Sequence, residues 1–88
     1  MKTPAPALIY PCTFPLKVIG RKADDFEALV VAIVRKHVPG LGEAAVTARL
    51  SAQGNYQAVT VTFVAESRLQ LDALYLELSQ CDRVLMTL

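Results

Sequence analysis

The sequence contains no tryptophan, a single histidine and two cysteines, and its charges nearly cancel. Nine lysines and arginines stand against eight aspartates and glutamates, which leaves a formal net charge of +1. Such a balance supplies no long-range attraction to nucleic acid or to an anionic membrane surface. We therefore expect neither nucleic acid nor a membrane among the partners.

Long apolar runs are also missing, and none reaches the roughly 18 residues that a transmembrane helix requires. The first eleven residues hold one lysine and three prolines, which interrupt the continuous apolar segment of a secretory leader. We expect a cytoplasmic protein. Residues 1–13 are predicted to form a flexible proline-rich tail, and residues 14–88 a single domain.

The sequence has neither the ligand spacing of a metal site nor the glycine-rich loop of a nucleotide site. His37 stands alone, and Cys12 and Cys81 are far apart in the chain, so no paired Cys or His motif exists. No GxGxxG or GxxxxGK[ST] pattern occurs. We expect no metal, no cofactor and two reduced thiols.

What the sequence does contain is a glycine-turned hairpin over residues 51–64, whose second arm alternates apolar and polar side chains. Val59, Val61 and Phe63 are predicted to face inward. Similar alternation predicts strands at 14–20, 44–51 and 82–88, with Val84, Met86 and Leu88 on the core face of the last strand. Because the chain ends within that strand, truncation of the C-terminus should damage the core.

Apolar residues at helical spacing predict one helix over about 24–38 and a second that begins at Ser67. Asp24 with Glu27, and Ser67 with Gln70, have the spacing of a capping box. The element order is therefore βαββαβ. It predicts an α+β, ferredoxin-like two-layer sandwich, with a four-stranded antiparallel sheet of order 4-1-3-2 and both helices on one face.

This topology puts Cys12 and Cys81 toward opposite ends of the sheet. With a rise of about 3.3 Å per strand residue, their separation is roughly 20 Å. A disulfide between them would contradict the fold.

Three adjacent residues, Gly20, Arg21 and Lys22, form a basic turn before the first helix. Cations and free backbone N–H groups at a helix N-terminus can hold a phosphate or a carboxylate, so these residues are the candidate ligand site. A solvated turn is the alternative. His37 is predicted to cap or pack a helix end, because a general base would need a nucleophile and an orienting carboxylate that the sequence does not place beside it.

The face of the sheet that carries no helix is the second candidate site. Its outward residues are a mixture of hydroxyl, basic and apolar side chains, which suits either a solvated surface or an interface. A homodimer could use this face or a strand edge. The predicted interface residues are Arg49, Tyr56, Thr60, Thr62 and Leu85.

Two other functions share this fold. RNA-recognition motifs stack bases on aromatic side chains of the two central strands, but Tyr56 is the one aromatic residue predicted on the outward face. Acylphosphatases use an arginine in the first loop and an asparagine on the sheet. Arg21 and Asn55 are of those types, but the glycine-rich phosphate loop is missing and Asn55 belongs to a turn.

Four motifs follow one another along the chain: Phe14-Pro15-x-Lys17-Val18-x-Gly20, His37-x-Pro39-Gly40, Ser51-x-x-Gly54-Asn55-Tyr56 and Leu74-Tyr75-x-x-Leu78. In this order and spacing, from about Phe14 to Leu88, they resemble the YbeD-like family of small bacterial proteins. The resemblance implies a ferredoxin-like fold similar to the ACT domains, which sense amino acids in metabolic enzymes. It implies a lipoate-attachment context and supplies no catalytic residues.

ACT-type ligand sites present an Asp-x-Pro-Gly-like turn after the first strand. The turn here, residues 20–24, keeps a glycine but lacks the proline-glycine pair. We expect a non-enzymatic regulatory or interaction module whose partner is a protein or a small metabolite, with ligand sensing at the first turn as its sharper form.

Overall fold

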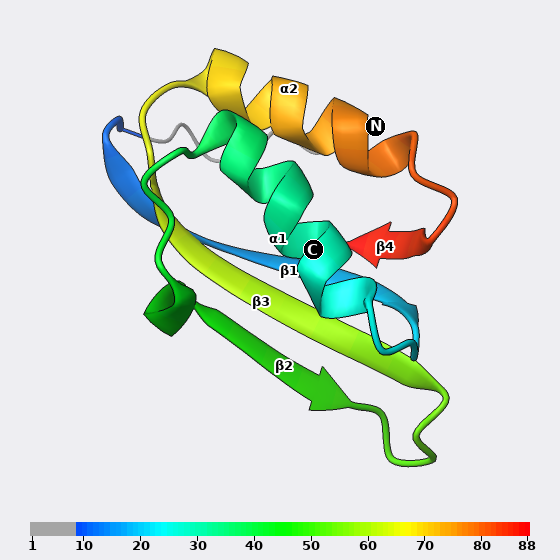
Figure 1. Ribbon diagram of the computed structural model, residues 1–88. Helices are drawn as coiled ribbons and strands as arrows, with labels where there is room; N and C mark the ends of the chain where they lie inside the picture. The colour runs from blue at the N-terminus through cyan, green and yellow to red at the C-terminus, as the bar shows by residue number, and fades with distance from the viewer. Residues whose placement is uncertain (1–8) are drawn as a thin grey trace.

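The computed structural model describes residues 9–88, so residues 1–8 of the predicted tail lie outside the described residues. The elements follow one another in the predicted order βαββαβ (Figure 1). They are β1 (Cys12–Arg21), α1 (Phe26–His37), the 3₁₀ turn η1 (Glu43–Ala45), β2 (Val46–Leu50), β3 (Tyr56–Ala65), α2 (Arg68–Ser79) and β4 (Val84–Thr87).

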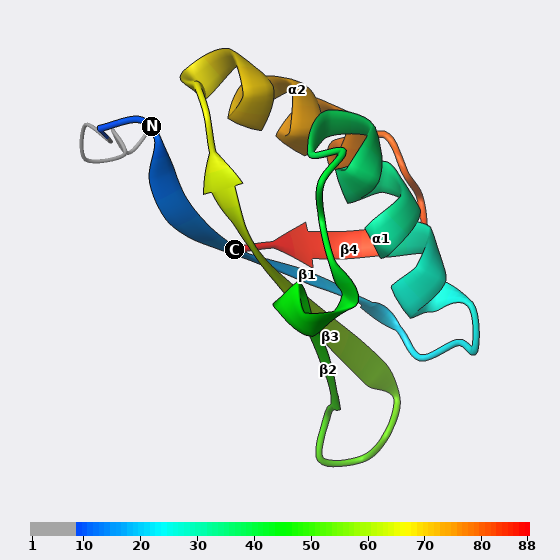
Figure 2. The same cartoon turned by 60° about the vertical axis from the view of Figure 1, so that its left-hand side comes forward.

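The four strands form one antiparallel sheet in the order β2-β3-β1-β4, which is the predicted order read from the other edge. Both helices cover the same face of this sheet, and among residues 9–88 no helix or strand lies over the opposite face (Figure 2). The predicted ferredoxin-like arrangement is therefore confirmed.

The core lies between the helices and the two central strands, because these strands are apolar at every second residue. Val59, Val61 and Phe63 are buried as predicted, and the helices contribute side chains at helical spacing. Burial of each large aliphatic or aromatic side chain stabilises the fold by about 1.5–3 kcal/mol. The buried side chains are Leu16, Val18, Phe26, Val30, Ile33, Val34, Leu41, Val59, Val61, Phe63, Ala65, Leu71, Leu74 and Leu78.

Strand β1 begins at Cys12, two residues before the predicted boundary. Successive residues of β1 direct their backbone N–H and C=O groups to opposite sides of the strand. Lys17 directs its groups toward β4, because it exchanges two hydrogen bonds with Leu88, the residue that follows β4. Pro15 therefore turns its nitrogen toward the same side, where no β4 residue is paired with it. A proline fits there because no ladder donor is needed at that position.

Strand β4 differs from its predicted orientation. Thr87 lies opposite Val18 and Met86 opposite Ile19, but Val84 lies opposite Gly20, so the register shifts by one residue. This bulge keeps Val84 on the core face and turns Met86 and Leu88 to the open face, where they are 53% and 62% exposed. The prediction of Met86 and Leu88 as core residues was wrong, because strict alternation does not hold across a bulge.

The predicted capping box of α1 is also wrong. Asp25 occupies the N-cap position and makes no side-chain hydrogen bond to the helix. Its carboxylate instead accepts from Arg83, with Oδ1 at 2.7 Å from Nη2. One half of the capping box predicted for α2 is confirmed, since Ser67 Oγ accepts from the Gln70 N–H at 3.1 Å. The other half differs, because Gln70 Oε1 accepts from the Glu66 N–H instead of the Ser67 N–H.

Candidate functional site

The basic turn at the end of β1 does not form a cradle. Gly20 is buried, and the ring of Phe26 lies over it so closely that a Cβ there would be 2.4 Å from Cε1. Arg21 belongs to β1 and lies opposite Tyr56, while the Lys22 N–H donates to the Asn55 carbonyl oxygen at 3.0 Å. Consecutive strand side chains point to opposite faces, so these three residues do not converge on one ligand.

Carboxylates also surround the start of α1. Asp24, Asp25 and Glu27 occupy the last turn before the helix and its first turn. Arg83 hydrogen-bonds Asp25 and holds the pKa of that carboxyl below its usual range. The helix N-terminus is therefore already supplied with negative charge, which opposes an added anion.

The open face of the sheet carries all the charged residues of the strands, and every one of them is a cation. Among residues 9–88 they are Lys17, Arg21 and Arg49, and no aspartate or glutamate occurs within a strand of this part of the chain. The register puts Lys17 beside Thr60, and Thr60 in turn lies opposite Thr47 of β2. All eight acidic residues lie outside the strands, in helices, turns and loops.

A shallow hollow of about 400 Å³ lies among these cations, lined by Lys17, Thr47, Ala48, Arg49, Ala58 and Thr60. Two cationic side chains and two threonine hydroxyls border it, which are the groups that proteins use to bind carboxylates and phosphates. We name Lys17, Thr47, Arg49 and Thr60 the basic hollow. It includes two of the five interface residues that the sequence predicted, Arg49 and Thr60.

The other three predicted interface residues surround this centre. Thr62 lies one step along β3 toward its C-terminal end, and Tyr56 lies at the opposite end of the strand, 43% exposed. Leu85 lies on β4 in the bulge and is 52% exposed. Together with Met86 and Leu88 it makes the β4 side of the open face apolar, a feature that the sequence missed because the bulge could not be anticipated.

His37 has a carboxylate partner that sequence reasoning did not find. Its Nε2 lies 2.9 Å from Oε1 of Glu77, while Lys36 Nζ donates to Oε2 at 2.6 Å. These two contacts, from Lys36 first and His37 second, hold the pKa of Glu77 below its usual range. The group ties the end of α1 to α2, in agreement with the expected packing role.

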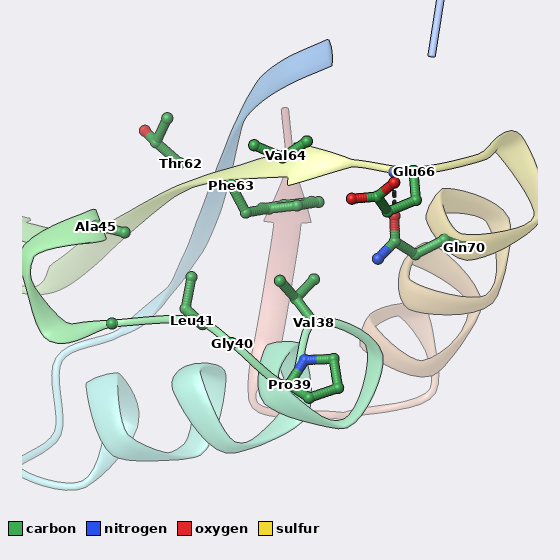
Figure 3. Close-up of a pocket in the computed structure, with 11 residues that line it drawn as sticks. Val38, Pro39, Gly40, Leu41, Ala45, Thr62, Phe63, Val64, Glu66 and Gln70 are labelled. Atoms are coloured by element: carbon green, nitrogen blue, oxygen red, sulfur yellow. Dashed lines mark hydrogen bonds between the residues drawn. The ribbon is translucent and has the colours of Figure 1, made fainter. Parts of the chain in front are cut away.

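A second hollow, of about 370 Å³, lies between the C-terminal part of β3 and the loop that follows α1 (Figure 3). Val38, Leu41 and Phe63 provide its apolar lining, and Glu66 and Gln70 mark its polar end. The Gln70 side chain is occupied, because Nε2 donates to the His37 carbonyl oxygen and Oε1 accepts from the Glu66 N–H. We name this hollow the β3-edge pocket.

Among the described residues, no three His, Cys, Asp or Glu side chains lie close enough to hold a metal ion. Both cysteines are free thiols. Within residues 9–88, no helix is long and apolar enough to cross a membrane.

The element order, the strand order and the helix-free face define a small ferredoxin-like domain. The family model "Protein of unknown function (DUF493)" matches residues 5–88, and the chain belongs to this family. This agrees with the resemblance that the sequence motifs showed.

Relatives with similar sequences come from several bacteria. A UPF0250 protein of Chromobacterium violaceum is 44% identical over 79 residues, which cover 90% of this chain and 89% of the relative. A UPF0250 protein of Neisseria gonorrhoeae is 40% identical over 79 residues, which cover 90% and 87%. The chain therefore spans nearly the full length of both.

A solution structure of HP0495 from Helicobacter pylori matches the fold with a TM-score of 0.69 at 18% identity, over 96% of this chain and 88% of that one. At this level of identity the likeness supports the fold alone.

Proposed function

We propose that this protein is a non-catalytic interaction module that docks an acidic surface of a protein partner on its open sheet face. The segregation of charge carries the proposal: every charge on the strands is positive and lies on this face, although the whole chain is nearly neutral. A partner carboxylate would enter the basic hollow, between Lys17 and Arg49.

The apolar side chains of β4 extend this surface. Protein interfaces combine an apolar core with polar groups around it, and Leu85, Met86 and Leu88 supply exposed apolar area next to the cations. Two copies of the open face would repel each other, because both carry only cations on their strands. An acidic partner therefore fits better than a face-to-face homodimer.

The test uses ¹⁵N-labelled protein and an octaglutamate peptide at low salt, where exposed charges are screened least. We expect amide shifts to change at Lys17, Thr47, Arg49 and Thr60, and the apparent affinity to fall by about tenfold in Arg49→Glu. Arg68→Glu is the matched control, since Arg68 is an exposed arginine on α2.

Equal losses in Arg49→Glu and Arg68→Glu, or no shift changes on the open face, would refute the proposal. An oligouridylate titration runs in parallel. If it binds the same face more tightly than octaglutamate, the acidic protein partner is replaced by RNA, for which Tyr56 and the three cations would be the binding groups.

A further inference from the structure

The C-terminal end of β3 has an unpaired edge. The pairing of β2 with β3 ends at Val46 opposite Val61, whereas β3 continues to Ala65 and remains paired with β1 on its other side. Where β2 would continue, the chain instead turns away through η1 and the loop after α1, and the β3-edge pocket occupies that place (Figure 3).

The register shows which backbone groups point toward this pocket. Ser51 N–H donates to the Tyr56 carbonyl oxygen, so Tyr56 directs its backbone groups toward β2. Direction alternates along a strand, and the register is regular, so Thr62 and Val64 also direct their N–H and C=O groups to the β2 side. Within residues 9–88, no strand residue lies opposite them there.

The backbone N–H of Glu66, the next residue with groups directed to the β2 side, already has a hydrogen-bond partner. Glu66 would point its N–H to the same side, and there the side-chain oxygen of Gln70 accepts it at 2.7 Å. Gln70 therefore closes one end of the unpaired edge, and the start of β2 closes the other. The open length between Thr62 and Val64 is about 7 Å at roughly 3.3 Å per residue, which suits a strand of three or four residues.

The lining determines the side chains that such a strand would carry. Below the edge, Val38, Leu41 and Phe63 offer an apolar floor for one aliphatic side chain. Glu66 lies at the α2 end, is exposed and forms no ion pair with a described residue. Figure 3 shows its side chain at the same end of the pocket as Gln70. A cation at that end of the ligand would be complementary to it.

We infer that the unpaired edge of β3 is a second binding site, which adds a short extended peptide segment of another protein as a strand. The segment places an aliphatic side chain in the β3-edge pocket and a lysine or arginine beside Glu66. Backbone hydrogen bonds to Thr62 and Val64 provide affinity, and the pocket provides selectivity. The site is separate from the basic hollow, so it does not depend on the acidic-partner proposal.

The first experiment selects a phage-displayed library of random octapeptides on the wild-type protein and on Gly42→Leu in parallel. Gly42 lines the pocket, a Cβ there meets no atom within 4 Å and its φ is not positive, so a leucine adds apolar bulk at the pocket wall without a backbone clash. We expect peptides enriched on wild-type protein to lose about tenfold in affinity for Gly42→Leu, and a similar amount for Glu66→Lys.

Ala52→Leu, which adds a leucine to the exposed β2–β3 turn, is the matched control and should leave the affinity within twofold. Arg49→Glu should also leave it unchanged, which separates this site from the open face. N-methylation of the peptide backbone should abolish binding, since it removes the donors to Thr62 and Val64.

In ¹⁵N spectra, the bound peptide should slow hydrogen exchange at the Thr62 and Val64 amides. The inference is overturned if wild-type protein enriches no peptide over Gly42→Leu, if the enriched peptides tolerate N-methylation, or if their shift changes lie on another surface.

Discussion

At Gly20 the space that a side chain would take is filled by the Phe26 ring and by the Arg83 carbonyl oxygen. The sequence placed this glycine in a ligand turn, and the structure shows a packing reason for it instead. Cations next to a glycine before a helix suggest an anion site. The sequence pattern cannot show that the ring of Phe26, six residues later, packs against this glycine. Gly20 matters because it lets β1, α1 and the start of β4 approach one another.

Gly20→Ala should therefore destabilise the fold. The added Cβ would lie 2.4 Å from Phe26 and 2.6 Å from the Arg83 oxygen, and both contacts are too short to form without a shift of the surrounding atoms. We expect the free energy of unfolding to fall by about 2 kcal/mol, as in other overpacked cores. Urea denaturation followed by circular dichroism measures it.

Gly40→Ala is the matched control, because a Cβ there meets nothing within 4 Å. It should leave stability unchanged or raise it by up to about 1 kcal/mol, through lower entropy of the unfolded chain. Similar losses in both variants would contradict the packing role of Gly20.

At the scale of elements, local patterns predicted every helix and strand, and errors are confined to their ends and to one bulge. The alternation of β3 was sufficient to assign its buried side chains, since the strand is central and regular. The orientation of β4 failed beyond the bulge, because one extra residue reverses the faces of all those that follow. The Glu77 partner of His37 was missed because helix packing, rather than sequence spacing, brings residues 40 apart together.

The bulge in β4 predicts that Val84 contributes more to stability than Met86, although its side chain is smaller. Val84→Ala should lower the free energy of unfolding by about 1 kcal/mol, because Val84 packs against the core. Met86→Ala should change it by less than about 0.5 kcal/mol, since Met86 lies on the open face. Thermal unfolding of both variants measures the order, and a larger loss in Met86→Ala would contradict the register.

The contact between α1 and α2 predicts a dependence of stability on pH. The pKa of Glu77 is lowered in the folded state, so its contribution is present above the unfolded value of about 4.3 and is lost as pH falls through the folded value. Glu77→Gln should be less stable than wild-type protein at pH 7, and the difference should shrink below about pH 4.3.

Asp72→Asn on the same helix is the control. Its carboxylate is exposed and lies 3.7 Å from Arg68, so the substitution should have a smaller effect at pH 7. Denaturant unfolding at a series of pH values measures both. A difference between Glu77→Gln and wild-type protein that does not change with pH would show that the ion pairs do not contribute.

For the whole molecule, the sequence predicted the layers, the strand order and the helix-free face, because each follows from the order of elements and the right-handed chain connections. It did not predict either hollow. The basic hollow needs the register that brings Lys17, Thr60 and Thr47 side by side, and the β3-edge pocket exists because β2 is five residues long while β3 is ten. Such differences in strand length arise from tertiary packing.

The placement of charge also has a consequence for how the molecule turns as it diffuses. The strands carry +3, while the described helices, turns and loops carry eight acids and five bases. A net charge near zero therefore hides an electric dipole. Near a negatively charged molecule, the net electrostatic force on the protein would be small because its net charge is small. The dipole would still produce a torque, which orients the strands toward that molecule before contact.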